Sequence, residues 1–292
     1  MTTPATATKA SSTEEARLLD TREILPGRVL QSWESPRIAR GVAPGQFVHV
    51  MAPRVSGLLL PAVPVAGYDR VRGTISLLLP AGAATSRDLA RARVDDRAHF
   101  DGPLGSSFAI DARSRYLLVV TDVGGLVRIR AVVDEAVLSG RQVTVLLGAD
   151  SVASVYPSSL LPDEAEYVVA TADGSLGHRG SVSDLVPEYE AWADQCFGAG
   201  SGALVARLAA LAKGRDGRMG VARLRRRRGK RPEPGGRDAR RRAWLQLALH
   251  HDAGCALGIC AGCVTAGASG PLRVCREGPA FAADELRLEP IG

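Results

Sequence analysis

Four cysteines near the carboxyl end of the chain have the spacing of a metal-cluster site. They follow the pattern Cys-x4-Cys-x2-Cys at Cys255, Cys260 and Cys263, then eleven residues, then Cys275. Thiolates are soft ligands that suit iron and zinc, and the x4/x2 spacing is that of plant-type [2Fe–2S] ligation. The pattern therefore favours a [2Fe–2S] cluster. A four-cysteine zinc site and a structural or disulfide role are the alternatives, although zinc sites more often use paired Cys-x2-Cys knuckles.

The residues between these cysteines are mostly small: Gly254, Ala256, Gly258, Ala261 and Gly262. A backbone that wraps a cluster and turns its N–H groups toward the sulfurs has no room for bulky side chains. Glycine also reaches positive φ angles that other residues avoid. The composition of the loop thus supports the interpretation drawn from the cysteine spacing.

The bulk composition indicates a globular protein with room for two or more domains. The chain has 292 residues, of which 46% are apolar and 4% aromatic. It has no apolar run of eighteen residues and no signal-peptide pattern, so we expect a cytoplasmic protein without a membrane span. Four of its five cysteines fall in one group, which is unlike a disulfide framework. We expect the fifth, Cys196, to be a buried small apolar residue.

The net charge of +6 is concentrated in one segment. Residues 213–242 contain fourteen Lys and Arg against three Asp and Glu, a local charge of +11, which leaves −5 for the rest of the chain. Repelling charges beside Pro and Gly predict a linker or an exposed loop. A nucleic-acid patch or a docking site for an acidic partner are sharper alternatives. Nucleic acid is disfavoured because no aromatic residue is interleaved to stack on bases.

The order of elements predicts an α+β protein of several domains. Residues 1–20 lack apolar periodicity and predict a disordered tail. Residues 21–112 contain short strands between Gly and Pro turns, for example 47–50 and 74–79, which predict a small antiparallel β-barrel. Residues 113–212 alternate strands with apolar helices, including a helix over 126–138, and predict a Rossmann-like α/β domain with a parallel sheet.

The carboxyl-terminal third is predicted to hold a basic linker and then a small cysteine domain. The linker covers residues 213–242, and the [2Fe–2S] domain covers 243–292. Residues 244–250 alternate apolar and polar side chains, which predicts a strand that leads into the cysteine loop.

In this order of parts the sequence resembles the electron transfer subunit of class 1B dihydroorotate dehydrogenase, the PyrK family of the ferredoxin-reductase superfamily. The likeness covers roughly residues 22–292, and the cysteine loop is its most specific part. Four other stretches carry it: 44–48 (PGQFV), 102–108 (GPLGSSF), 173–180 (DGSLGHRG) and 277–281 (EGPAF).

The resemblance implies a function in pyrimidine biosynthesis. In such subunits a nicotinamide passes a hydride to FAD, and a [2Fe–2S] cluster carries single electrons to FMN in a separate catalytic subunit. The protein holds and tunes these cofactors. No side-chain acid–base pair or nucleophile stands out in this sequence, so cofactors would perform any catalysis. Whether the chain is itself an enzyme is left open, with an electron-transfer subunit without its own substrate site favoured.

The predicted FAD seat departs from the family pattern. The family has an arginine for the pyrophosphate and a hydroxyl for the flavin after its second barrel strand, where residues 60–63 here read Leu-Pro-Ala-Val. The later Gly-x-Gly-Thr loop survives in part as residues 82–85 (GAAT). Gly82 and Thr85 are therefore the candidate FAD contacts, with a surface turn as the structural alternative.

The predicted NAD seat is altered as well. The family's glycine-rich turn reads here as residues 121–128 (TDVGGLVR), where Asp122 places an anion at the position of the ligand's anion. Asp122 could instead cap the following helix. Residues 197–202 (FGAGSG) replace the family's Cys-Gly-Pro.

Three hypotheses follow. The leading one is an electron transfer subunit with a [2Fe–2S] cluster and FAD if retained, working with an FMN-bearing catalytic subunit or a similar flavoprotein. The second is a non-enzymatic relative that keeps the cluster, has lost FAD and NAD, and acts as a relay or partner subunit. The third is a zinc-bearing nucleic-acid binder that uses the basic run 225–231.

Overall fold

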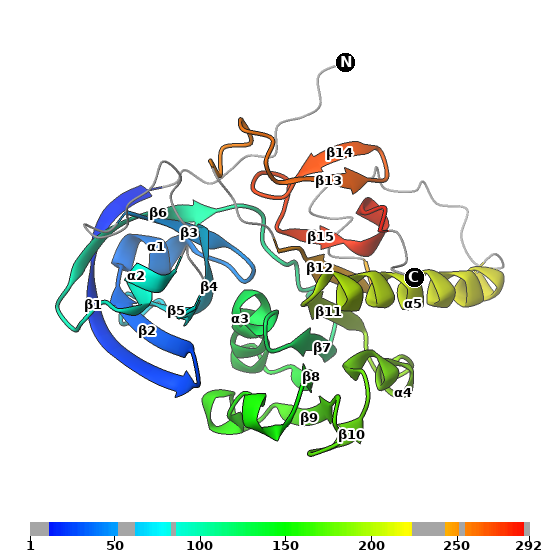
Figure 1. The fold of residues 1–292 in the computed structure, drawn as a ribbon. Helices are drawn as coiled ribbons and strands as arrows, with labels where there is room; N and C mark the ends of the chain where they lie inside the picture. The colour runs from blue at the N-terminus through cyan, green and yellow to red at the C-terminus, as the bar shows by residue number, and fades with distance from the viewer. Residues whose placement is uncertain (1–11, 52–61, 83–85, 224–242, 251–254, 289–292) are drawn as a thin grey trace.

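The computed structural model describes residues 12–51, 62–82, 86–223, 243–250 and 255–288, without the side chains of 216–223. A closed barrel and a seven-stranded sheet form its two main parts, and a small two-stranded sheet lies beside the larger one (Figure 1). The fold class predicted from the sequence is confirmed: an antiparallel barrel, a parallel α/β sheet and a cysteine-rich segment. No helix in these ranges is long and apolar enough to cross a membrane.

Six antiparallel strands close the barrel in the order β1-β2-β5-β4-β3-β6. Their bounds are β1 Ser12–Leu25, β2 Arg28–Glu34, β3 Phe47–Met51, β4 Ala62–Asp69, β5 Thr74–Pro80 and β6 Arg97–Leu104. The short helices α1 (Pro36–Gly41) and α2 (Arg87–Ala90) connect them. Alternate residues point inward, and Trp33 and Phe100 meet in the centre with ring centroids 5.1 Å apart. The barrel therefore has a filled core of its own.

The larger sheet has the strand order β10-β9-β8-β7-β11-β12-β15. Its strands are β7 Tyr116–Asp122, β8 Gln142–Ala149, β9 Glu166–Thr171, β10 His178–Arg179, β11 Gln195–Ala199, β12 Leu245–Ala248 and β15 Ala280–Ala282. Neighbours from β10 to β12 pair in parallel, whereas β15 is antiparallel to β12. The predicted helix is α3, Leu126–Leu138.

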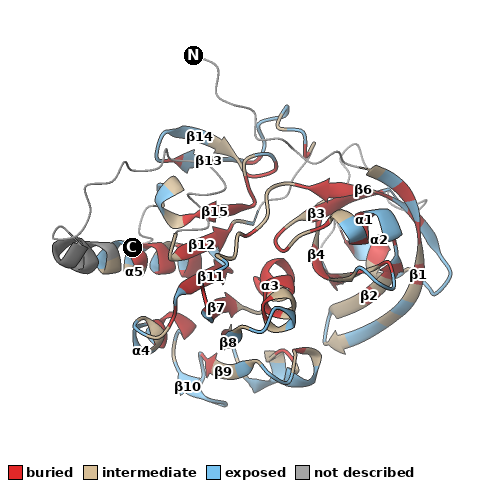
Figure 2. Ribbon diagram, turned by 180° about the vertical axis from the view of Figure 1, so that it is seen from behind, coloured by how far each residue is buried: buried red, intermediate tan, exposed pale blue. Residues whose placement is uncertain are grey.

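Helices cover both faces of this sheet (Figure 2). Helix α3 packs on the face that presents Leu117 and Val119, while α5 (Gly202–Arg223) packs on the face of Leu118 and Val120. Successive residues of β7 are thus buried on opposite sides, as in a sheet with both faces covered. The shorter helices are α4 Val186–Tyr189, η1 Val152–Ser154, η2 Ser158–Leu160, η3 Val182–Asp184 and η4 Ala283–Glu285.

The amino-terminal boundary differs from the prediction. Residues 12–20, expected in a disordered tail, form the first part of β1, while residues 1–11 lie outside the described residues. Ala16 and Leu18 are fully buried in the barrel, but the inward position before them holds Glu14. This buried carboxylate hides the apolar alternation from the sequence. It accepts hydrogen bonds from the Ser35 hydroxyl at 2.5 Å and from the Ile38 N–H at 2.8 Å.

The carboxyl-terminal boundaries differ as well. Helix α5 continues to Arg223, so the predicted linker begins as helix, and the basic run 225–231 lies outside the described residues. The predicted separate cysteine domain contributes β12 and β15 to the α/β sheet. All four residues of β12 are buried, because it is an inner strand between β11 and β15. The cysteine segment is therefore built onto the sheet.

Candidate metal centre

The four predicted cysteines lie on one loop and one hairpin. Cys255 and Cys260 belong to the loop before β13 (Val264–Gly267), Cys263 immediately precedes β13, and Cys275 follows β14 (Gly270–Arg273). Cys263 and Cys275 are buried, Cys255 is half-buried and Cys260 is exposed. The hairpin register pairs the residue after Cys263 with Arg273, which brings the two distant cysteines together.

The loop wraps around the sulfur of Cys255. The backbone N–H groups of Ile259 and Cys260 each donate to this sulfur over 3.4 Å. Positive φ angles at Ala256 (48°), Gly258 (74°) and Ala261 (55°) turn the chain so tightly. The N–H of Cys260, followed by that of Leu257, lowers the pKa of Cys255 to about 6. Inward-turned N–H groups that stabilise a thiolate are what a cluster ligand requires.

Cys263 and Cys275 form the second half of the centre. The backbone N–H of Cys275 donates to the sulfur of Cys263 over 3.5 Å, and the N–H of Val274 donates to the Cys263 carbonyl over 3.0 Å. Burial, followed by a hydrogen bond with the Cys263 thiol, raises the pKa of Cys275 to about 12. A bound cation reverses this preference, since a coordinating thiol is deprotonated outright.

The four thiols are thus arranged as two pairs. Cys255 contacts Cys260, Cys263 contacts Cys275, and the charge of Cys255 also acts on Cys275. Within the described ranges, no group of three or more His, Cys, Asp or Glu side chains is arranged to hold a metal ion as it stands. A two-iron cluster distributes its four ligands over two irons. Two thiol pairs are compatible with that distribution.

An ion pair between Arg273 and Glu277 lies against the cysteine loop. Arg273 Nη2 lies 2.6 Å from Glu277 Oε1, and Arg273 Nη1 donates to the carbonyl of Gly258 over 3.5 Å. The guanidinium therefore ties the end of β14 to the strained part of the cysteine loop. Leu257 and Ile259 of the same loop are 61% and 78% exposed, so an apolar rim borders the exposed Cys260.

The turn after β6, which contains Gly105 and Ser106, joins the barrel to the cysteine segment. The Ser106 hydroxyl donates to the carbonyl oxygens of Glu277 and Ala280, over 2.9 and 3.0 Å. Gly105 has a φ of +76°, and a Cβ there would lie 2.7 Å from Pro279 Cδ. Phe47 of β3 joins the same buried cluster as Cys263 and Cys275. The cysteine segment is consequently held between barrel and sheet.

The structure gives little support to the predicted FAD contacts. Gly82 lies in an exposed turn, where an added Cβ would meet nothing within 4 Å, and Thr85 lies outside the described residues. The neighbouring Ser86 hydroxyl is already donated to the Pro80 carbonyl over 2.6 Å. Ala62 and Val63, at the start of β4, bear no group that binds a pyrophosphate. Among the described positions of the predicted FAD seat, the fit to FAD is therefore poor.

Asp122 of the predicted NAD seat is not the N-cap of α3, which is Gly125 and has no side-chain capping bond; Asp122 instead accepts the backbone N–H groups that precede two helices. Its Oδ1 accepts the backbone N–H of Gly125, the residue before α3, over 2.7 Å. Its Oδ2 accepts the N–H of Ser201, the residue before α5, over 2.7 Å. The sequence predicted neither this second contact nor the buried Arg128 beside it, which donates to the Gly200 carbonyl over 3.3 Å.

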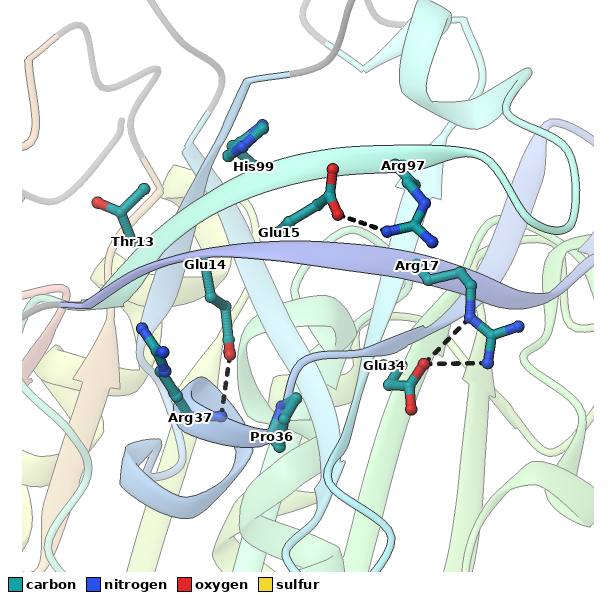
Figure 3. A pocket seen from close by; sticks show the side chains of 9 residues that line it. All are labelled: Thr13, Glu14, Glu15, Arg17, Glu34, Pro36, Arg37, Arg97 and His99. Carbon is teal, nitrogen blue, oxygen red and sulfur yellow. Dashed lines mark hydrogen bonds and ion pairs between the residues drawn. The ribbon is translucent and has the colours of Figure 1, made fainter.

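A hollow of about 560 Å³ lies elsewhere, on the outer wall of the barrel (Figure 3). Its charges are matched within the wall: Arg17 pairs with Glu34 at 3.0 Å, and Arg97 pairs with Glu15 at 2.5 Å. Glu14 points inward to the start of α1, as described above. None of the predicted site residues lines this hollow, and we assign it no function.

The cysteine segment matches a known domain. Residues 253–287 fit the family model described as the iron–sulfur cluster binding domain of dihydroorotate dehydrogenase B. The chain is also 26% identical over 275 residues to the electron transfer subunit of dihydroorotate dehydrogenase B (NAD(+)) from Desulforamulus reducens, covering 91% of this chain and 95% of that protein. Over most of its length this chain is therefore similar to these electron transfer subunits.

A further relative and two solved structures are also similar to this chain. The electron transfer subunit of dihydroorotate dehydrogenase B from Shouchella clausii is 27% identical over 252 residues, covering 84% of this chain and 86% of that protein. A solved structure of an NADH-dependent reduced ferredoxin-NADP oxidoreductase superposes with a TM-score of 0.73 at 17% identity, covering 93% of this chain and 89% of its own.

A ferredoxin reductase of carbazole 1,9a-dioxygenase matches with a TM-score of 0.55 at 19% identity. It covers 64% of this chain and 61% of its own. At these identities the likeness to solved structures concerns the fold alone. The fold of this chain is ferredoxin-reductase-like.

Proposed function

We propose that this chain is the electron transfer subunit of a dihydroorotate dehydrogenase B and that Cys255, Cys260, Cys263 and Cys275 hold a [2Fe–2S] cluster. When bound, such a cluster supplies one-electron transfer at low potential. The observation that carries the proposal is the arrangement of the four thiols as two contacting pairs on a loop whose N–H groups point at sulfur. The match of residues 253–287 to the cluster-binding domain supports it.

The chain's own residues perform three tasks in this proposal. The Ile259 and Cys260 N–H groups stabilise negative charge on sulfur and so raise the reduction potential above that of a bare four-thiolate site. The buried Cys263 and Cys275 exclude water from one side. The exposed Cys260 leaves the other side within reach of a partner protein.

The proposed partner is the FMN-bearing catalytic subunit that acts on dihydroorotate and orotate. The names of the relatives describe one subunit of an enzyme, which supports a separate catalytic partner. The apolar rim of Leu257 and Ile259 around Cys260 has the composition of an interface core. No electron-transfer step is assigned to FAD, because the described part of its predicted seat does not supply phosphate contacts.

The direct test is electron delivery. The chain is purified anaerobically, reduced with dithionite, freed of excess reductant and mixed with the oxidised catalytic subunit in a stopped-flow instrument. We expect the partner's flavin absorbance to bleach as the cluster absorbance returns. A partner flavin that stays oxidised in a verified complex would contradict the proposal.

The second candidate, a cluster-bearing relative without nicotinamide binding, is favoured by one observation. Asp122 already fills the anion position at the starts of both α3 and α5. This affects where electrons enter the chain and leaves the cluster assignment unchanged.

A further inference from the structure

Asp122 lies at the position of the α/β sheet where nucleotides usually bind. It ends β7, and β7 pairs with β8 on one side and with β11 on the other. The chain leaves β7 through α3 and leaves β11 through α5, and these helices lie on opposite faces of the sheet. Such a point is a topological switch, outside whose strand ends ligands bind in open α/β sheets. The region outside the carboxyl ends of β7 and β11 is thus the expected ligand site.

The carboxylate of Asp122 already makes the contacts that a phosphate would make there. One oxygen accepts the N–H of Gly125 and the other accepts the N–H of Ser201, both over 2.7 Å. These two N–H groups stand at the amino ends of a 13-residue and a 22-residue helix. Helix amino ends present free N–H groups and partial positive charge, which is why phosphates bind there. In this protein the Asp122 carboxylate accepts both N–H groups, and the Gly125 N–H also donates to the Asp122 backbone carbonyl over 3.0 Å.

The two turns also leave no space between them. A Cβ added to Gly125 would lie 2.2 Å from the Ala199 carbonyl oxygen, so this turn is in backbone contact with the end of β11. A Cβ added to Gly200 would lie 2.8 Å from Asp122 Oδ2. The glycines therefore serve close packing around the carboxylate. In a dinucleotide site, glycines at such positions would instead leave room for the pyrophosphate.

The charge of Asp122 is balanced from inside the protein. Arg128, one turn into α3 and 7% exposed, donates to the Gly200 carbonyl over 3.3 Å and contacts His250 Nδ1 at 3.2 Å. Burial lowers the pKa of Arg128 to about 10, while Asp122 opposes this shift. An incoming diphosphate would meet a fixed carboxylate and an arginine whose two Nη atoms are already engaged, while its buried Nε has no partner among the described residues. The like charges of a diphosphate and of the half-buried Asp122 carboxylate would repel each other.

We propose that the Asp122 carboxylate occupies the position of a ligand phosphate at the carboxyl ends of β7 and β11, so that the α/β domain does not bind nicotinamide dinucleotides. The inference goes beyond the proposed electron-transfer role, because it concerns the donor side and does not depend on the cluster. It also assigns the glycine-rich turns of this domain a structural use.

The test is nucleotide binding to the full chain. NADH and ADP-ribose are titrated into the anaerobically purified protein by calorimetry, with wild type, Asp122→Gly and Asp122→Asn compared. We expect no saturable binding to wild type up to about 1 mM, and ADP-ribose binding to Asp122→Gly at least about tenfold tighter than to wild type. Asp122→Asn should gain less, because its amide still accepts one N–H.

Asp194→Asn is the matched control. The Asp194 carboxylate also accepts two backbone N–H groups, those of Arg115 at 2.8 Å and Tyr116 at 3.1 Å, but at the opposite end of β7. This variant should bind nucleotide no better than wild type.

Two results would overturn the inference. One is saturable micromolar binding of NADH to wild type. The other is nucleotide binding as weak as that of wild type in an Asp122 variant that circular dichroism and a cooperative melt show to be folded. If Asp122→Gly does not fold, the affinity of Asp122→Asn decides. Iron is assayed in every sample, so that failure of the cluster proposal is recognised separately from failure of this one.

Discussion

The sulfur of Cys263 accepts the backbone N–H of Cys275 over 3.5 Å across the β13–β14 hairpin. On the other side of the loop the sulfur of Cys255 accepts the N–H of Cys260 over 3.4 Å. Each contact joins the two members of one thiol pair. The backbone groups in these contacts belong to the cysteine loop and its hairpin. Removal of one cysteine should therefore disable the centre without unfolding the barrel or the sheet.

Replacement of Cys260 by Ser should abolish stable cluster binding. A serine hydroxyl is a harder and far less acidic ligand than a thiol, so one iron would lose a thiolate. We expect visible absorbance and bound iron to fall by about tenfold or more in Cys260→Ser, with the far-ultraviolet circular dichroism unchanged.

The control is Cys196→Ala. Cys196 is fully buried in β11, and burial raises the pKa of its thiol well above the usual range. It should keep its iron. Loss of iron from Cys196→Ala, or full iron in Cys260→Ser, would contradict the assignment of the ligands.

Replacement of Arg273 by Gln should make the cluster more labile. The side chain bridges Glu277 and the Gly258 carbonyl, so its loss frees the part of the loop that holds positive φ angles. We expect cluster loss in air or with a chelator to accelerate by about tenfold, as is common for residues that position metal ligands.

Arg287→Gln offers a comparison, because Arg287 donates to the Ala268 carbonyl over 3.0 Å on the outer side of the same hairpin. The rate of cluster loss from Arg287→Gln should match that of wild type. Equal rates in both variants would mean that the Arg273 bridge does not hold the loop.

Replacement of Ser106 by Ala should weaken the join between barrel and cysteine segment. Two buried carbonyl oxygens lose their donor, at a cost of about 1–3 kcal/mol. The denaturant midpoint followed by cluster absorbance should fall more than in Ser139→Ala, whose hydroxyl donates to two carbonyls within the end of α3 itself. A larger shift of the denaturant midpoint in Ser139→Ala than in Ser106→Ala would show that Ser106 does not stabilise the join between barrel and cysteine segment.

His49 should make stability depend on pH. Its ring is 6% exposed, its Nε2 has no hydrogen-bond partner among the described residues, and burial lowers its pKa while Asp101 opposes the shift. Below the ordinary histidine pKa of about 6.5, the unfolded chain binds a proton that the folded chain does not. The free energy of unfolding should therefore fall as pH falls through this region.

The comparison is wild type against His49→Gln in urea at pH 7.5 and pH 5.5. The loss on acidification should be greater in wild type by about 0.5 kcal/mol or more. Equal losses in the two proteins would show that His49 is protonated as readily in the folded state as in the unfolded chain.

Much of the fold could be predicted because the local signals agree with the tertiary structure. The helix over 126–138 was predicted with both its ends, and the strands around 47–50 and 74–79 were found from their apolar runs. The strand β1 was missed because Glu14 holds an inward position, where three hydrogen-bond donors at the start of α1 compensate it. That compensation comes from residues more than twenty positions away and leaves no local mark.

The site was predictable in part for the same reason. Cysteine spacing is a local pattern, so the four candidate ligands could be named, whereas the tie from Ser106 to Glu277 joins residues 171 positions apart. Capping of α3 by Asp122 was a stated alternative, but the N-cap of α3 is Gly125, and the contact of Asp122 with Ser201 spans 79 positions. Gly82 and Thr85 stay predictions as FAD contacts.

The central claim is that the four cysteines hold two irons, and metal analysis of the protein tests it most directly. Iron, acid-labile sulfide and zinc are measured per chain in anaerobically purified wild type, alongside the spin-resonance spectrum of the dithionite-reduced sample. The account predicts about two irons and two sulfides per chain and the signal of a reduced [2Fe–2S] centre. About one zinc per chain, with no iron, no sulfide and no such signal, would contradict it.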